Sequence, residues 1–454
     1  MEQSKDFLAT RPIGRLLLQL SLPTVAAQLI NMLYNVVDRI YIGHIPGEGA
    51  LALTGVGVCM PLILIISAFA ALVGNGGAPR ASIALGKKQT AEAEQILGNC
   101  FVTQLLVSAV LTAVVLIWNR PLLLAFGASS NTIDYSVAYM NLYALGTVFV
   151  QLTLGMNAFI TAQGFAKVGM LSVLIGAVAN TALDPLFIFG FHMGVQGAAL
   201  ATVLSNVIGI VYLIWYKMHH EMILTFNSKP ARESVRHLGR VFALGFPNAI
   251  SNILNGFAST FSNQLLVLYG TSAVAAMAAA GKATMIVGLL QMGLCMGVQP
   301  LMAYYYGAGD MRRIKEVVMK LFILTLGIGV VFGAVGMLGS KALVGLFIRD
   351  LEVVELGQKI VCIQLLSAPF AGIYYIGQNF MQATGSALMA TITSVLRQGV
   401  LLIPLLYIMN AIMKMMGIPT AHVIADFISI VVTSVLTVII YKKVKNQLKQ
   451  KREA

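Results

Sequence analysis

Apolar residues run through this chain in long segments, separated by short stretches that carry glycine, proline and charged residues. A helix needs about 20 apolar residues to cross a bilayer, and each segment reaches that length. The short alternating segments of a membrane barrel are not visible. We therefore predict an all-α polytopic membrane protein with twelve transmembrane helices. The expected spans are 16–42, 51–77, 93–117, 135–160, 168–190, 195–216, 238–268, 275–300, 316–338, 356–380, 388–410 and 418–441.

Helix-breaking and polar positions recur in the second half of the chain in the register of the first. Four positions are matched 221 residues later: Pro79 by Pro300, Gly86 by Gly307, Asn157 by Gln378 and Gly164 by Gly385. Six spans followed by six similar spans predict a parallel repeat, two pseudo-symmetric six-helix bundles with a cavity between them. We expect an N-terminal bundle over 1–216, a cytoplasmic linker over 217–237, and a C-terminal bundle with a basic tail over 238–454.

The charged residues are informative mainly through their positions along the sequence. The chain is 58% hydrophobic and 10% charged, with a net charge of +13. Most Lys and Arg residues lie in the termini, the central loop and alternate short loops, which is the positive-inside pattern. It predicts a multi-pass protein of the cytoplasmic membrane with both termini in the cytoplasm. No basic patch is interleaved with base-stacking aromatic residues, so we expect no nucleic-acid partner.

Motifs for enzymatic chemistry are missing from the sequence. There is no Gly-x-x-x-x-Gly-Lys-Ser/Thr loop, no His-Glu-x-x-His motif and no Ser-His-Asp set. The four cysteines lie in or beside apolar segments without paired spacing, as buried small hydrophobes do. We predict a protein that is not an enzyme and has no cofactor. Any uphill work must then come from an ion gradient or from a partner.

Two aspartates, Asp38 and Asp184, lie inside predicted spans. A carboxylate in hydrocarbon is costly and usually has a task. Asn180 precedes Asp184 by one helical turn on the same face, and Thr202 lies at a comparable depth in the next span. These oxygens suit a hard cation such as Na⁺, or a proton shared between two carboxylates, and the sequence does not separate the two. Pro185 bends the helix beside the carboxylate, either statically or as a conformational kink.

Three polar features allow structural interpretations as well. Asp38 could instead pair with Arg39 near the outer surface, although consecutive helix residues do not face each other. Arg397 and Asp426 could pair within the membrane. A polar stripe on the seventh span could line a water-filled cavity or make interhelical hydrogen bonds. This stripe consists of Asn248, Asn252, Asn255, Ser259 and Ser262.

These residues resemble those of the MATE family of multidrug and toxic compound extrusion transporters. The segment 29–38, ending at Asp38, is similar to the family's first-helix motif, the segment 194–199 to its sixth-helix signature, and the segment 157–164 to the end of its fourth helix. The resemblance covers essentially the whole chain. It implies a V-shaped pair of bundles that alternate between outward-open and inward-open states. It also implies cation-driven export of bulky, often cationic, organic compounds.

The resemblance also suggests roles for individual residues. In the branch with an acidic cluster in the first bundle, the matched cation positions are Asp38, Asn180, Asp184 and Thr202. The substrate cavity would be lined by Tyr34, Asn157 and Tyr139, to which we add Asn35 and Asn255. The branch with acidic residues on the seventh and tenth helices is not matched, because those spans carry no internal carboxylate.

A second hypothesis is a flippase for lipid-linked sugars or related amphiphiles, with the same superfamily shape. Such a protein would need a cavity rich in Arg and Lys to hold phosphate. The spans offer mainly Arg39, Lys282 and Arg397, so we favour the exporter. We expect its partners to be small organic substrates and the lipid bilayer, and we expect a monomer.

Overall fold

The computed structural model describes residues 7–220, 222–224, 234–348 and 350–453. By internal contacts the described chain divides into two compact units. Unit 1 comprises residues 26–245, and unit 2 comprises residues 7–25 and 246–453. Part of the predicted linker, residues 225–233, lies outside the described residues.

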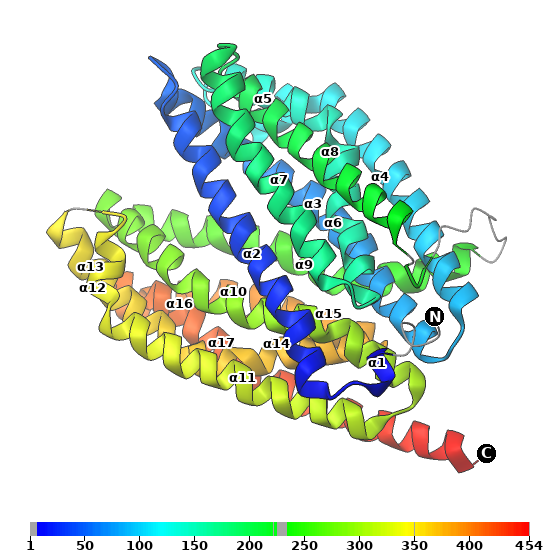
Figure 1. Cartoon of the computed structure of the whole chain (residues 1–454). Helices are drawn as coiled ribbons and strands as arrows, with labels where there is room; N and C mark the ends of the chain where they lie inside the picture. Colours follow the sequence, from blue (N-terminus) through cyan, green and yellow to red (C-terminus); the bar gives the residue numbers. More distant parts are fainter. Residues whose placement is uncertain (1–6, 221, 225–233, 349, 454) are drawn as a thin grey trace. The chain divides into compact units, whose positions relative to one another are not determined.

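Unit 1 is a helical bundle in which α3 packs against α4 and α6, and α7 packs against α8 (Figure 1). These contacts explain why its spans are long and apolar, because each helix buries one side against a neighbour and leaves the other for lipid. Its elements are the second part of α2 (Ile13–Gly43), α3 (Gly49–Gly86), α4 (Thr90–Ala125), α5 (Ile133–Leu145), α6 (Thr147–Ala162), α7 (Ala166–Pro185), the π-helix η2 (Leu186–Gly190), α8 (Val195–His219) and the first part of α9 (Ser234–Val267).

Unit 2 is a second bundle, in which α10 packs against α11, α13 and α14, and α16 packs against α17. Its elements are α1 (Phe7–Thr10), the first part of α2, the remainder of α9, α10 (Thr271–Ala308), α11 (Met311–Leu338), α12 (Ser340–Gly345), α13 (Leu351–Gln364), the 3₁₀ turn η3 (Leu365–Ser367), α14 (Ala368–Ala383), α15 (Ala387–Val395), the π-helix η4 (Leu396–Leu401), α16 (Leu402–Met413), the 3₁₀ turn η5 (Lys414–Met416) and α17 (Gly417–Glu453).

Two helices, α2 and α9, belong partly to each unit. Val25 is the last α2 residue of unit 2, and Gly245 is the last α9 residue of unit 1. Pro23 and Pro247 each lie two residues from these divisions. Proline removes a hydrogen bond from the helical ladder, so both shared helices have a weakened ladder where they pass from one unit to the other.

Every predicted span corresponds to a helix or to a continuous run of helices. By length and hydropathy alone, the described residues contain nine helices that could cross a membrane, or ten if the bent pair α5 and α6 counts as one span. The bend between α5 and α6 is 58°. The run from Ala387 to Leu448 is counted once, although it contains two predicted spans, and α9 is not among the nine. The polar stripe on α9 lowers its hydropathy and explains that omission.

The repeat has a structural counterpart in the turns that follow α6 and α14. Gly164 and Gly385 are matched positions, and both have positive φ angles, 89° and 78°. The amide of Gly164 donates to Thr161 O at 2.9 Å, and that of Gly385 donates to Gln382 O at 3.1 Å. Both turns therefore end a helix in the left-handed conformation that glycine adopts without steric cost.

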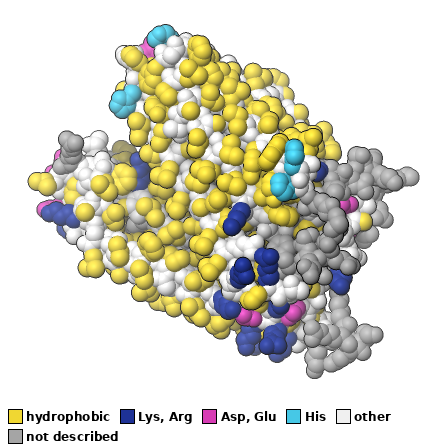
Figure 2. All heavy atoms as spheres, in the orientation of Figure 1, with side chains coloured by type: hydrophobic (Ala, Val, Ile, Leu, Met, Phe, Trp, Pro, Cys, Tyr) yellow, Lys and Arg dark blue, Asp and Glu magenta, His cyan; other side chains and the backbone are white. Residues whose placement is uncertain are grey.

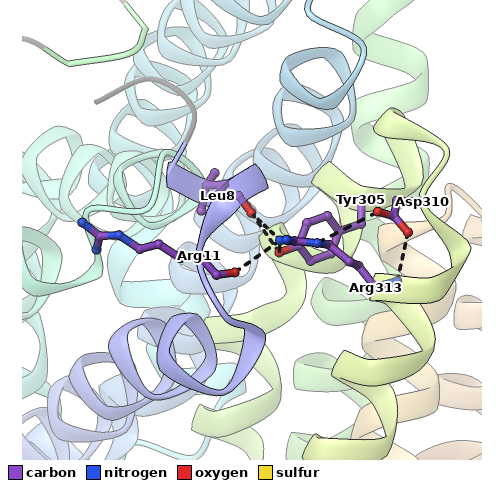
Figure 3. Close-up of polar contacts among 5 residues, drawn as sticks. All are labelled: Leu8, Arg11, Tyr305, Asp310 and Arg313. Carbon is purple, nitrogen blue, oxygen red and sulfur yellow. Dashed lines mark hydrogen bonds and ion pairs between the residues drawn. The ribbon is translucent and has the colours of Figure 1, made fainter. Parts of the chain in front are cut away.

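The N-terminal helix α1 is fastened to unit 2 by a cluster of polar contacts, which we call the N-terminal clasp (Figure 3). The buried Tyr305 hydroxyl donates to Leu8 O at 2.8 Å. Arg313 Nη1 donates to Leu8 O at 3.4 Å, to Arg11 O at 3.3 Å and to the Tyr305 hydroxyl at 3.1 Å. Asp310 caps α11 by accepting from the Arg313 amide at 3.0 Å. The clasp thus holds the start of α2 against α10 and α11.

Hydrophobic side chains cover most of the face drawn in Figure 2, as expected for contact with lipid chains. Many of the Lys and Arg side chains on this face gather around the start of α2. Many large apolar residues in the middle of the spans are exposed, including Leu106, Val211 and Val431. In a protein surrounded by water such exposure would be unfavourable, so the surface supports a multi-pass membrane protein.

Candidate functional site

The interior of unit 1 contains a carboxylate and an amide from the same face of α7. Asp184 is 0% exposed and Asn180 is 1% exposed. Asn180 Nδ2 donates to Asp184 Oδ1 at 3.4 Å, as their four-residue spacing predicts. Pro185 follows directly, and the π-helix η2 begins after it. Proline supplies no amide hydrogen for the ladder, which accounts for the change of helix type beside the carboxylate.

Asp38, on α2, is brought to the same place. Its side chain is 9% exposed, and its carboxyl group faces that of Asp184 within interaction distance. The alternative pairing with Arg39 is not found among the described ion pairs, because the Arg39 side chain is directed to Met60 Sδ at 3.3 Å. Two ionised carboxylates that face each other in a low dielectric repel strongly, so a proton or a cation between them is strongly stabilising.

Three oxygen atoms of this site accept no hydrogen bond from the described residues: Asp38 Oδ1, Asn180 Oδ1 and Asp184 Oδ2. A buried acceptor without a donor costs about 1–3 kcal/mol. Three such atoms in one place fit a hard cation, which prefers carboxylate and amide oxygens. They fit a proton as well, since a protonated carboxyl group donates to its neighbour. We refer to Asp38, Asn180 and Asp184 as the acidic pair site.

Thr202, the fourth predicted ligand, lies beside the hydroxyl of Tyr139. Within the described residues no hydrogen bond joins Thr202 to either carboxylate. Tyr139 is 4% exposed, stacks on Tyr143 with 6.1 Å between ring centroids, and belongs to the hydrophobic core of unit 1. Tyr34, which is half-buried, lies close to both carboxylates. A shell of tyrosines therefore borders the acidic pair site.

The other predicted cavity residues have different surroundings. Asn157 Nδ2 donates to Gly169 O at 3.2 Å and so ties α6 to α7. Asn35 is exposed, and its Nδ2 donates to Asn31 O one turn earlier on α2. Asn255 is exposed on the part of α9 that belongs to unit 2. Tyr34 and Tyr139 thus lie close to the carboxylates, Asn35 lies beside Tyr34 on α2, and Asn157 joins two helices of unit 1.

The polar stripe on α9 joins other helices at its two ends. At one end Gln382 Nε2 donates to Asn248 Oδ1 at 3.1 Å, and at the other the Ser262 hydroxyl lies 3.4 Å from His422 Nε2. Between them Asn252 and Ser259 are exposed. The ends of the stripe therefore support the interpretation as interhelical hydrogen bonds, and its middle is exposed.

Arg397 and Asp426 form the ion pair that the sequence suggested. Arg397 Nε donates to Asp426 Oδ1 at 2.8 Å, and both side chains are mostly buried in unit 2. Asp426 Oδ2 accepts from the Ser367 hydroxyl at 3.0 Å, and the guanidinium lies 4.4 Å from the centre of the Tyr374 ring. Ser367 and Tyr374 could not be identified from the sequence, because no spacing along the chain connects them with this pair.

The MatE family model matches the chain twice, over residues 23–186 and over residues 247–408. The chain is similar to "Multidrug export protein MepA" of Staphylococcus aureus (strain NCTC 8325 / PS 47), with 30% identity over 417 residues and 91% of each chain covered. It is 27% identical over 437 residues to the MepA protein of Staphylococcus haemolyticus (strain JCSC1435), covering 96% of this chain and 95% of that one.

Solved structures agree with this fold. A structure described as "Crystal structure of MATE in complex with MaD3S" has a TM-score of 0.91 and 20% identity, and covers 98% of this chain and 99% of its own. Another, "Outward-facing conformation of a multidrug resistance MATE family transporter of the MOP superfamily", has a TM-score of 0.89 and 20% identity, with coverage of 97% and 98%. The predicted class, twelve membrane helices in two bundles, is thus confirmed.

Proposed function

This chain belongs to the MatE family, and on that basis we propose that it is a multidrug exporter that exchanges H⁺ or Na⁺ for organic, often cationic, compounds. It is a membrane transporter and not an enzyme. Its coupling residues are Asp38, Asn180 and Asp184, with Thr202 and Tyr34 at the border of their site. We place it in the cytoplasmic membrane as a monomer with both termini in the cytoplasm, as the distribution of Lys and Arg indicates.

One observation carries the coupling proposal. The carboxyl groups of Asp38 and Asp184 face each other in the interior of unit 1, and each has a buried oxygen that accepts no hydrogen bond from the described residues. A static pair of this kind would only destabilise the bundle. A pair that gains and loses a cation during each cycle has a reason to be there.

Coupling follows from the difference between the loaded and the empty pair. A proton or Na⁺ between the carboxylates removes their repulsion and draws α2 and α7 together, whereas the empty pair pushes them apart. The π-helix after Pro185 lets α7 change its winding at this point. The cation can bias the transport cycle only by binding one conformation better than the other. Substrate release is then favoured in the conformation that the cation prefers.

The test is efflux of a fluorescent cationic dye from proteoliposomes that contain the purified protein. An imposed pH gradient and an imposed Na⁺ gradient are applied separately, each with and without an ionophore that collapses it. We expect one gradient to drive efflux and its ionophore to abolish it, which would also identify the ion. Equal, passive efflux under both gradients, across several dyes, would overturn the proposal.

The flippase hypothesis finds little support in the basic residues of the spans. Arg397 is paired with Asp426, and Lys282 lies 5.6 Å from the centre of the Phe347 ring. Arg39 is exposed and contacts Met60. Each of these three cations is thus engaged by a neighbour of its own, which leaves few for binding phosphate. Transfer of a lipid-linked sugar in the same proteoliposomes, without dye efflux, would reverse this preference.

A further inference from the structure

Unit 2 contains a cavity of about 210 Å³ that the proposed transport cycle does not use. It is bordered by α10, α14, the turn between α13 and α14, η4 and α17. Transported drugs need pockets of about 300–1,000 Å³, so this cavity is too small for the bulky compounds of the proposed function. Its volume equals that of about seven water molecules in the liquid, at about 30 Å³ each.

Two of the hydrogen-bond donors around this cavity are already committed to the protein. Gln291 Nε2 donates to Thr325 O at 3.0 Å and to Ala368 O at 2.8 Å. The Thr284 hydroxyl donates to Gln364 Oε1 at 3.2 Å. By contrast, Gln291 Oε1 is buried and accepts no hydrogen bond from any described residue. Since an unmet buried acceptor is unfavourable, the cavity calls for a ligand that brings an O–H or N–H group.

The charges at the cavity wall favour a ligand without net charge. Arg397 and Asp426 neutralise each other through a single contact from Nε, which leaves the terminal guanidinium nitrogens without an ion pair among the described residues. An added cation would lie beside Arg397, and an added anion would lie beside Asp426 and the unmet oxygen of Gln291. Either would be buried with a like charge close by.

A hydroxyl group satisfies both requirements. It donates to Gln291 Oε1, accepts from the guanidinium of Arg397 and carries no charge. The rest of the lining includes Met285, Val287 and Ala371, which suit an apolar body. We propose that the cavity binds small uncharged hydroxyl compounds with an apolar body, of which phenol is the simplest. This site lies in unit 2 and is independent of the acidic pair site.

The probe is 4-fluorophenol, observed by fluorine NMR with the purified full-length protein in detergent micelles. Fluorobenzene is the matched probe, because it has the same ring and lacks the hydroxyl group. Protein-free micelles give the background from partitioning. We expect saturable binding of 4-fluorophenol that unlabelled phenol displaces, and at least tenfold weaker binding of fluorobenzene, since one buried hydrogen bond is worth about 1.4 kcal/mol or a factor of ten.

Two glycine variants on α10 test whether this binding takes place in the cavity. Gly288 lines the cavity, and a Cβ built there meets only the Tyr375 hydroxyl, at 3.9 Å, so Gly288→Leu fills the space without a backbone clash. Gly281 does not line the cavity and has nothing within 4 Å of its Cβ position, so Gly281→Leu is the control. We expect Gly288→Leu to abolish 4-fluorophenol binding and Gly281→Leu to keep it.

Three results would contradict the proposed binding site. They are non-saturable binding of 4-fluorophenol, equal binding of both fluorinated probes, and unchanged binding to Gly288→Leu. The variant Gln291→Leu offers a separate check, because it removes the acceptor without filling the cavity. Binding to folded Gln291→Leu is expected to fall to the level of fluorobenzene. Its melting curve, compared with that of wild type, tells loss of the acceptor apart from loss of the fold.

Discussion

The carboxyl group of Asp38, on α2, faces that of Asp184, on α7, inside unit 1, and neither has a salt-bridge partner among the described residues. Asp184 also accepts from Asn180 on its own helix. The acidic pair is therefore held in place by one neutral donor and by packing. Its properties depend on what enters between the two carboxyl groups.

We expect Asp38→Asn and Asp184→Asn each to reduce ion-driven dye efflux by about tenfold or more, because each removes a charged ligand worth about 1.5–3 kcal/mol. Dye binding at equilibrium should change much less, since the cation and not the dye uses these oxygens. The measurement is the initial rate of efflux in proteoliposomes together with dye affinity in detergent. Asp134→Asn is the matched control, because the Asp134 side chain is 79% exposed and pairs with Arg120 at the surface. Wild-type efflux from the double variant would remove the coupling role.

For the ion pair of unit 2, we expect loss of one partner to destabilise the protein more than replacement of both partners. In Asp426→Asn, Arg397 stays buried without its counter-charge, at a cost of about 3 kcal/mol. We expect the double variant Arg397→Met/Asp426→Leu to be more stable than Asp426→Asn, because it leaves no unpaired charge. Thermal unfolding of wild type and the two variants in detergent, followed by circular dichroism of the helices, provides the comparison. A double variant that unfolds earlier than Asp426→Asn would mean that the pair stabilises unit 2 by itself.

The sequence was sufficient for the spans, because hydrocarbon imposes a length and an apolar composition that are visible along the chain. It also identified Asp184 and Asn180 correctly as neighbours, because four residues on a helix fix their geometry. It did not show that Asn157, which the family resemblance suggested for the substrate cavity, also ties α6 to α7. The partition of α2 at Val25 was not visible either, because it depends on which helices pack around each half.

Contacts between helices that are distant along the chain could not be predicted from the sequence, for the same reason. Ser367 and Asp426 meet because α17 packs beside the turn before α14, and no periodicity encodes that meeting. The matched glycines were the exception. Gly164 and Gly385 could be paired from their register alone, since a turn that needs positive φ selects glycine in both halves.

Close packing of α3 and α6 in unit 1 depends on glycine. A Cβ at Gly74 would lie 2.7 Å from the Cα of Gly155, which is backbone and cannot move aside. We expect Gly74→Ala to destabilise the bundle by about 1–3 kcal/mol through overpacking. Gly57→Ala on the same helix is the control, because nothing lies within 4 Å of its Cβ position. Apparent melting temperatures of the two variants in detergent test this, and equal values would show that α3 and α6 can separate at no cost.

The N-terminal clasp predicts a local effect. Arg313 donates to the carbonyl groups of Leu8 and Arg11, and Tyr305 donates to that of Leu8. Arg313→Ala removes two of these contacts, and hydrogen bonds to charged groups are worth about 1.5–3 kcal/mol each. We therefore expect the amides of α1 and the first turn of α2 to exchange with deuterium at least tenfold faster, while those in the middle of α10 keep their protection.

Arg312→Ala is the matched control for the clasp, because Arg312 is the exposed neighbour on the same helix turn and makes no contact with Leu8 among the described residues. Its exchange in α1 should match wild type. Tyr305→Phe keeps the ring and removes only the donor to Leu8 O, so its exchange should lie between those of wild type and Arg313→Ala. If all three variants exchange alike in α1, packing of Leu8 and not the polar contacts fastens the N-terminus to unit 2.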